Sequence, residues 1–175
     1  MNRRRCLAAG AATLLGACSS VPLERTTITP TQLESRAVHP ALACGYRLDN
    51  VLDRRAAETA GSLGAHAFSV EDAAGLVHRR LQARGFVDDP SLPALSVELR
   101  QLYITGNQSS KVPVAVYRIS IDEDPPRILR SHATSMNWNG TEAESQRAIG
   151  RALDDVDAQL LHALNARCRQ RTAGT

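Results

Sequence analysis

A long amphipathic stripe near the C-terminus constrains the fold more than any other feature. Apolar residues recur there at spacings of four, three, four and four, at Ile149, Leu153, Val156, Leu160 and Leu164. This spacing places them on one face of an α-helix, which must be buried against another element. Thr141 and Glu144 form a capping box, whose side chains bond each other's backbone N–H groups and begin the helix. Cys168 continues the stripe by one turn.

A second, shorter helix is predicted over 69–84. Four residues share one face at helical spacing, namely Val70, Ala73, Val77 and Leu81. Ser69 is the expected N-cap, with Asp72 three residues later as a weaker form of the capping box. Gly85 is placed to end the helix in the left-handed conformation that favours glycine.

Four segments show the alternation of apolar and polar residues that is typical of β-strands. They are 41–52, 94–104, 111–121 and 127–136, and the polar segment 53–64 is expected to be a loop. Short links between the last three strands favour an antiparallel meander. The order β-α-β-β-β-α predicts an α+β two-layer sandwich, with a mostly antiparallel four-stranded sheet and two helices on one face.

The N-terminus has the pattern of an export signal. Arg3, Arg4 and Arg5 precede an apolar run too short for a membrane-spanning helix, which needs about 20 residues. The run ends in Leu15-Gly16-Ala17-Cys18, which resembles the bacterial lipobox. This resemblance implies cleavage before Cys18 and attachment of lipid, palmitate included, to that cysteine. The alternative is an ordinary signal peptide with a cysteine at the cleavage point by chance.

The lipobox divides the chain into four parts. Residues 1–17 are the expected signal peptide, 18–40 a lipidated cysteine and flexible tether, 41–170 a single α+β domain, and 171–175 a disordered tail. Ser19, rather than Asp, follows the lipid site, which implies the outer membrane of a Gram-negative bacterium and a periplasmic location for the domain. Without the three signal arginines, 18 basic and 18 acidic residues remain. We therefore expect a membrane contact through lipid, and no nucleic-acid partner.

The cysteine count then predicts one disulfide. Cys6 leaves with the signal peptide and Cys18 carries lipid, so only Cys44 and Cys168 remain. Disulfides persist in an oxidising compartment such as the periplasm, which favours a Cys44–Cys168 pair. The alternative is two unpaired thiols buried as small apolar groups.

The sequence contains no pattern that indicates catalysis. The five histidines lack zinc-ligand spacing, and there is no Gly-x-Ser-x-Gly elbow or phosphate-binding glycine loop. We therefore expect no metal, no cofactor and no enzymatic activity. The carboxylates of Asp154, Asp155 and Asp157 are expected on a solvated helix face.

Four residues are candidates for contact with a partner. Arg100, Arg118 and Arg130 lie on three neighbouring predicted strands and could form a basic patch. Trp138, between the last strand and the long helix, is either a packing plug or an exposed anchor for a partner or lipid.

Several segments resemble the YajG-like outer-membrane lipoproteins. They are Asp53-x-Arg55, Leu63-Gly64, Leu81-Gln82-Ala83-Arg84-Gly85-Phe86, Leu95-Ser96-Val97-Glu98-Leu99, and the pattern from Ala152-Leu153-Asp154-Asp155 to Leu160-Leu161-His162-Ala163-Leu164. The element order also resembles the plug lipoprotein of the lipopolysaccharide translocon. Tyr46-Arg47-Leu48-Asp49 resembles the opening motif of ABC-type transport auxiliary lipoproteins.

These resemblances imply a location and fold rather than an activity. We expect a non-enzymatic accessory or binding component of an envelope assembly or transport complex, with an envelope protein as partner. The alternative is a module that binds lipid or glycolipid.

Overall fold

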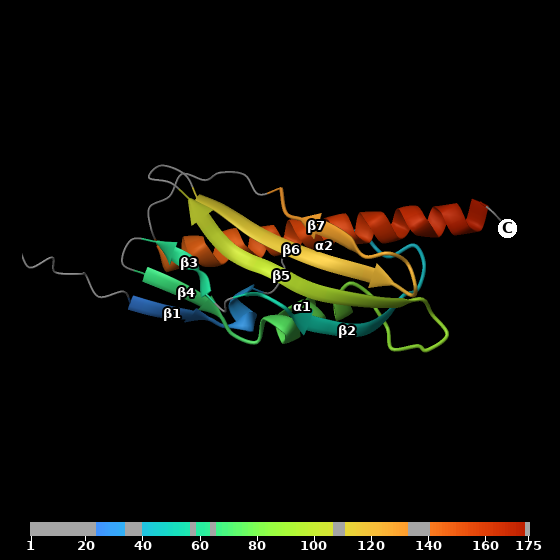
Figure 1. The fold of residues 1–175 in the computed structure, drawn as a ribbon, viewed down its shortest axis with the longest axis horizontal. Coiled ribbons are helices and arrows are strands. Elements are labelled where there is room, and N and C mark those ends of the chain that lie inside the picture. Colours follow the sequence, from blue (N-terminus) through green and yellow to red (C-terminus); the bar gives the residue numbers. More distant parts are fainter. Residues whose placement is uncertain are drawn as a thin grey trace, which may run out of the picture.

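The computed structural model describes residues 24–33, 40–56, 59–63, 66–106, 111–132 and 141–173. These residues form an α+β fold of two sheets and two α-helices (Figure 1), which confirms the predicted class. The elements are β1 (Glu24–Ile28), η1 (Pro30–Leu33), β2 (Arg47–Asp53), β3 (Thr59–Leu63), β4 (His66–Val70), α1 (Ala73–Gln82), β5 (Ala94–Gly106), β6 (Lys111–Ile121), β7 (Arg127–Arg130) and α2 (Glu142–Ala173).

The larger sheet has the strand order β2-β5-β6-β7. β5, β6 and β7 form the expected antiparallel meander, whereas β2 pairs with β5 in parallel. α1 and α2 both cover the same face of this sheet (Figure 1). The two-layer arrangement of four strands and two helices is therefore confirmed.

The core lies between this sheet and α2. The predicted stripe is fully buried, since Ile149, Leu153, Val156, Leu160 and Leu164 are all 0% exposed. β5 and β6 pack against this helix. Burial of each large aliphatic side chain contributes about 1.5–3 kcal/mol to stability, so every residue of the stripe stabilises the contact between α2 and the sheet.

The helix ends follow the predicted capping chemistry in part. The Thr141 N–H donates to Glu144 Oε2 at 3.1 Å, and the Glu144 N–H donates to Thr141 Oγ1 at 3.3 Å, which confirms the capping box. Gly85 has φ of 95°, in the left-handed region. The predicted start of α1 at Ser69 is wrong, because Ser69 belongs to β4 and pairs with β1. Asp72 is the N-cap instead, and its Oδ1 accepts from the Gly75 N–H at 3.1 Å.

A second sheet, with strand order β1-β4-β3, corrects two expectations. Part of the predicted tether, from Glu24 to Leu33, forms β1 and η1, and Ile28 and Leu33 are 0% and 1% exposed. β1 is rich in β-branched residues, which favour strands. The predicted loop 53–64 contains β3, whose backbone approaches β5 so closely that a Cβ at Gly61 would lie 2.4 Å from the Ile104 carbonyl oxygen.

The last predicted strand and the long C-terminal helix end at residues other than those predicted. β7 stops at Arg130, and residues 133–136 of that predicted strand lie outside the described residues. α2 continues to Ala173, so at least three residues of the predicted disordered tail are helical. The long helix extends beyond the end of the sheet toward the C-terminus (Figure 1).

Candidate functional site

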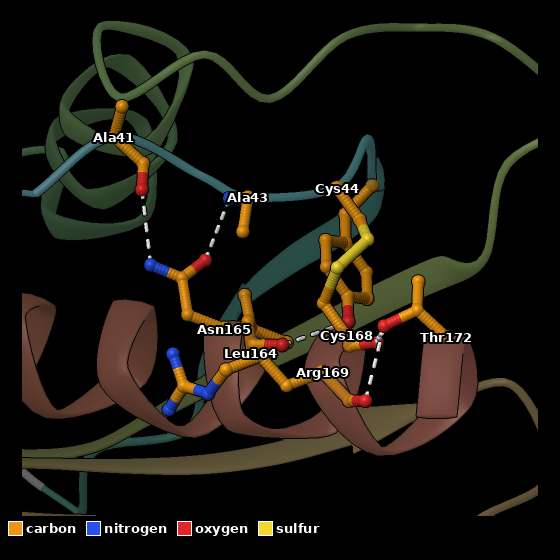
Figure 2. Close-up of a disulfide and its surroundings, with 9 residues drawn as sticks. Ala41, Ala43, Cys44, Leu164, Asn165, Cys168, Arg169 and Thr172 are labelled. Carbon is orange, nitrogen blue, oxygen red and sulfur yellow. Dashed lines mark hydrogen bonds between the residues drawn. A yellow bond between two sulfur atoms is a disulfide. The ribbon is translucent and has the colours of Figure 1, made fainter. Parts of the chain in front are cut away.

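The Cys44–Cys168 disulfide joins the segment before β2 to the C-terminal third of α2 (Figure 2). Their Cα atoms are 5.9 Å apart, and the two cysteines are 124 positions apart in the sequence. The predicted pairing is confirmed. For a loop of about 100 residues, chain-entropy models give about 4.7 kcal/mol of stabilisation.

Hydrogen bonds reinforce this junction (Figure 2). Asn165 accepts from the Ala43 N–H at 2.7 Å and donates to the Ala41 carbonyl at 2.9 Å. The buried Tyr46 hydroxyl donates to the Leu164 carbonyl at 3.1 Å. Burial raises the pKa of Tyr46, against the opposing effect of Arg167 and Arg171, so this phenol remains a donor. The last turns of α2 are thus held by covalent and polar contacts.

A buried ionic network fixes the middle of α2. Arg80 of α1 donates to Asp157 Oδ2 at 3.0 Å, to Asp154 Oδ1 at 2.7 Å and to the Leu33 carbonyl at 2.8 Å. The Tyr117 hydroxyl of β6 donates to Asp157 Oδ1 at 3.0 Å. Arg80 is 4% exposed, and Asp157 and Tyr117 are 0% exposed.

The network corrects the expectation that the aspartates of α2 form a solvated face. Burial raises the pKa of the Asp157 carboxyl, and the Arg80 guanidinium and Tyr117 hydroxyl act against that rise. Burial also raises the pKa of Tyr117 well above its ordinary value, so its hydroxyl stays protonated. Because these groups are closed to solvent, we assign them to structure rather than to contact with a substrate.

The spacing of residues in the sequence already indicates this network. Asp157 lies four residues after Leu153 and three before Leu160, which places it on the apolar stripe of α2. Arg80 likewise follows Leu76 and Val77 by four and three residues on the buried face of α1. Opposite charges on two facing apolar stripes indicate a buried ion pair.

The opposite face of the larger sheet carries the predicted arginines. Arg118 pairs across the strands with Glu98 of β5 and Ile128 of β7. Its Nη1 lies 2.9 Å from Glu98 Oε1, and Arg100 Nη1 lies 3.3 Å from Glu98 Oε2. Arg130 lies opposite Val116, which is two residues from Arg118 along β6 and therefore on the same face of the sheet. The structure therefore brings the three arginines onto one face, with one carboxylate shared between two of them.

Apolar side chains flank this basic group. Leu52 of β2 is 36% exposed and lies beside Glu98, while Ile128 is 61% exposed and lies beside Arg118. We call this surface the arginine face, defined by Leu52, Glu98, Arg100, Arg118, Ile128 and Arg130. Its three cations and one anion leave it with a local positive charge.

A cleft of about 340 Å³ lies between the end of β6, the turn that leads to β7, and the C-terminal third of α2. This volume is at the low end of the usual range of about 300–1,000 Å³ for ligand sites. The lining residues are Ile119, Ser120, Ile121, Asp124, Pro125, Arg127, Ala163, Ala166, Arg167 and Gln170. Arg167 forms an ion pair with Asp124 across the cleft. Sequence reasoning missed this site, because its two walls are far apart in the chain.

Other predicted site residues cannot be placed. Cys18 of the lipobox and Trp138 lie outside the described residues. Among the described residues, no group of three or more His, Cys, Asp or Glu side chains could hold a metal ion. Within the part of the chain that the structure describes, no helix has the length and hydrophobicity needed to cross a membrane.

The chain was also compared with known proteins. No protein-family model matches it, and no curated protein matches it significantly.

Proposed function

We propose that this chain is a lipid-anchored periplasmic protein of the outer membrane, and that it serves as a non-enzymatic accessory component of an envelope assembly or transport complex. The Cys44–Cys168 disulfide is the observation that carries the proposal, since such bonds persist in oxidising compartments. It agrees with the lipobox at Cys18, which would attach the protein to the membrane.

The arginine face is the proposed contact surface for the partner. Arg is enriched at the centres of protein interfaces, and its planar guanidinium matches the geometry of carboxylates. Arg100 and Arg118 are already held by Glu98, so they are positioned before a partner arrives. Ile128 adds exposed apolar area beside them. This combination favours a partner that presents an acidic surface with an apolar centre. Trp138 stays a candidate contact as well.

Photo-crosslinking in the native cells tests this proposal. A benzoylphenylalanine at Ile128 would lie on the arginine face, and one at the exposed Ala83, the C-cap of α1, would serve as the matched control. We expect Ile128 to capture a recurrent envelope protein that Ala83 does not capture. Reversal of charge by Arg118→Glu should weaken that capture. Equal products at both positions, or none at Ile128, would contradict the proposal.

A lipid- or glycolipid-binding module is the second candidate function. The cleft between β6, β7 and α2 favours it, because aliphatic walls are combined there with two guanidinium groups at the rim. Native mass spectrometry of protein released from membranes tests this candidate. Co-purified lipid that Ala166→Phe removes would support it, whereas protein free of lipid would count against it.

A further inference from the structure

We infer that the cleft binds an anionic amphiphile, with the carboxylate or phosphate head between Arg127 and Arg167 and the hydrocarbon chain against Ile119 and Ile121. The inference rests on the lipid-binding candidate function, because it names the ligand class that this function would require.

The apolar part of the site is formed where α2 faces the end of β6. Residues 163, 166, 167 and 170 follow helical spacing and form a second stripe beside the leucine stripe. Ala163 and Ala166 are small and half-buried, whereas Leu160 and Leu164 on the first stripe are fully buried. Ile119 and Ile121 line the same cleft and are 2% and 8% exposed, so a small part of each side chain reaches this space. A hydrocarbon chain in this space would have aliphatic groups on two sides.

The cationic part of the site comes from two elements. Arg167, on α2, lines the cleft, and its buried Nε has no hydrogen-bond partner among the described residues. The buried Nε atoms of Arg47 and Arg84 have no such partner either, so the position of Arg167 in the cleft, rather than the unpaired donor itself, assigns it to the ligand. Arg127, at the start of β7, lines the same cleft and makes no ion pair with any described residue. Two guanidinium forks can bind the several oxygens of a carboxylate or phosphate.

Asp124 makes the inference more specific. It lies in the turn between β6 and β7, where its carboxylate already pairs with Arg167. A ligand anion must share Arg167 with this carboxylate or displace it. Removal of the negative charge by Asp124→Asn should therefore strengthen the binding of an anion, although it removes a native ion pair. A site for an uncharged chain would show no such gain.

Photoaffinity labelling of the full-length protein in isolated membranes tests the inference. The probe is a dodecanoate that carries a diazirine, and the competitors are dodecyl phosphate, dodecyl maltoside and inorganic phosphate. We expect adducts on the peptides that contain Ile119 or Ala166. Ala166→Phe should lower this labelling by about fivefold, while Ala143→Phe, at an exposed position of α2, should not. Asp124→Asn should raise labelling, and Arg127→Gln should lower it. These two exposed residues keep the test valid if the Ala166 variant unfolds.

The competitors distinguish an anionic amphiphile from an uncharged amphiphile and from a free anion. Dodecyl phosphate should compete about tenfold better than dodecyl maltoside, in line with the free energy of charge-assisted hydrogen bonds. Equal competition by these two compounds would overturn the role of the arginines, yet leave lipid binding intact. Equal competition by inorganic phosphate would indicate a site for a free anion and would overturn the amphiphile. Labelling that none of the cleft variants changes would overturn both this inference and the lipid-binding function.

Discussion

The middle of α2 and its C-terminal third are attached to the rest of the protein in different ways. In the middle, Asp157 is fully buried and satisfied by Arg80 and Tyr117. In the last third, a disulfide and three hydrogen bonds hold the helix at Cys168, Asn165 and Leu164, while an open cleft lies beside it.

This difference indicates that the two parts of α2 have different roles. The closed region, in which Asp157 is paired with both Arg80 and Tyr117, leaves no room for a ligand, and it sets the register between the two helices. A covalently held region can leave space unfilled, because its position does not depend on side-chain packing alone. We therefore place ligand binding at the C-terminal third of α2 and stability in its middle.

Truncation of the buried Asp157 carboxylate should have the largest effect on stability. Asp157→Ala leaves the Arg80 guanidinium and the Tyr117 hydroxyl buried with fewer partners. We expect a loss of about 3–5 kcal/mol in the free energy of unfolding. Urea denaturation measures this loss, and Asp88→Ala, at an exposed position, should change stability by less than about 0.5 kcal/mol. Similar values for both variants would show that the network contributes little.

Removal of the disulfide should destabilise the C-terminal third of α2. Cys168→Ser should lower stability by about 2–5 kcal/mol. Hydrogen exchange should rise in residues 164–173 and stay slow around Leu153, which lies in the closed region. The double variant with Cys44→Ser should match the single variant, since either change breaks the same bond. Equal loss of protection along all of α2 would remove the distinction between the two regions.

Enlarged side chains compare the packing of the two regions directly. Ala152, at 1% exposure, lies in the closed region, so Ala152→Leu should overpack it and cost about 1–3 kcal/mol. Ala166 lines the cleft, so Ala166→Leu should find space and change stability by less than about 0.5 kcal/mol. Thermal denaturation of both variants measures the difference. Comparable destabilisation at the two positions would mean that the cleft is filled.

The ion pair of Asp53 and Arg55, whose side chains are 31% and 4% exposed, gives the smallest expected effect and serves as a baseline for the fully buried network. The hydrogen bond from Arg55 holds the pKa of the Asp53 carboxyl below its ordinary value of about 3.9. Because the folded pKa is lowered, the stabilisation is fully present above the unfolded pKa and is lost as pH falls through the folded one. We expect Asp53→Asn to change stability by less than about 1 kcal/mol at neutral pH, and less still in acid. Paired denaturation curves across that range measure it. A growing difference toward low pH would contradict the assignment.

Local patterns in the sequence predicted much of this fold. The stripe from Ile149 to Leu164, the Thr141 capping box and the left-handed Gly85 depend on neighbouring residues, and each is observed. The Cys44–Cys168 pair was predictable because the expected signal peptide and lipobox account for the other two cysteines.

Features that depend on distant parts of the chain were missed. β1 is stabilised by β4, and the pair Ile28 and Val70 joins positions 42 residues apart, so a short segment rich in threonine was mistaken for a tether. The cleft is formed by residues near 120 and near 165, and only their packing shows that Ala163 and Ala166 leave space there. The arginine face was predictable in outline, but the sharing of Glu98 by Arg100 and Arg118 was not.

The intact mass of the native protein, measured without reduction, tests whether it is a lipid-anchored protein of the periplasm. We expect a chain that begins at Cys18, carries acyl groups on that residue and lacks two hydrogens because Cys44 and Cys168 are bonded. A chain that retains Met1 to Ala17 and has two free thiols would contradict the lipid-anchored periplasmic assignment.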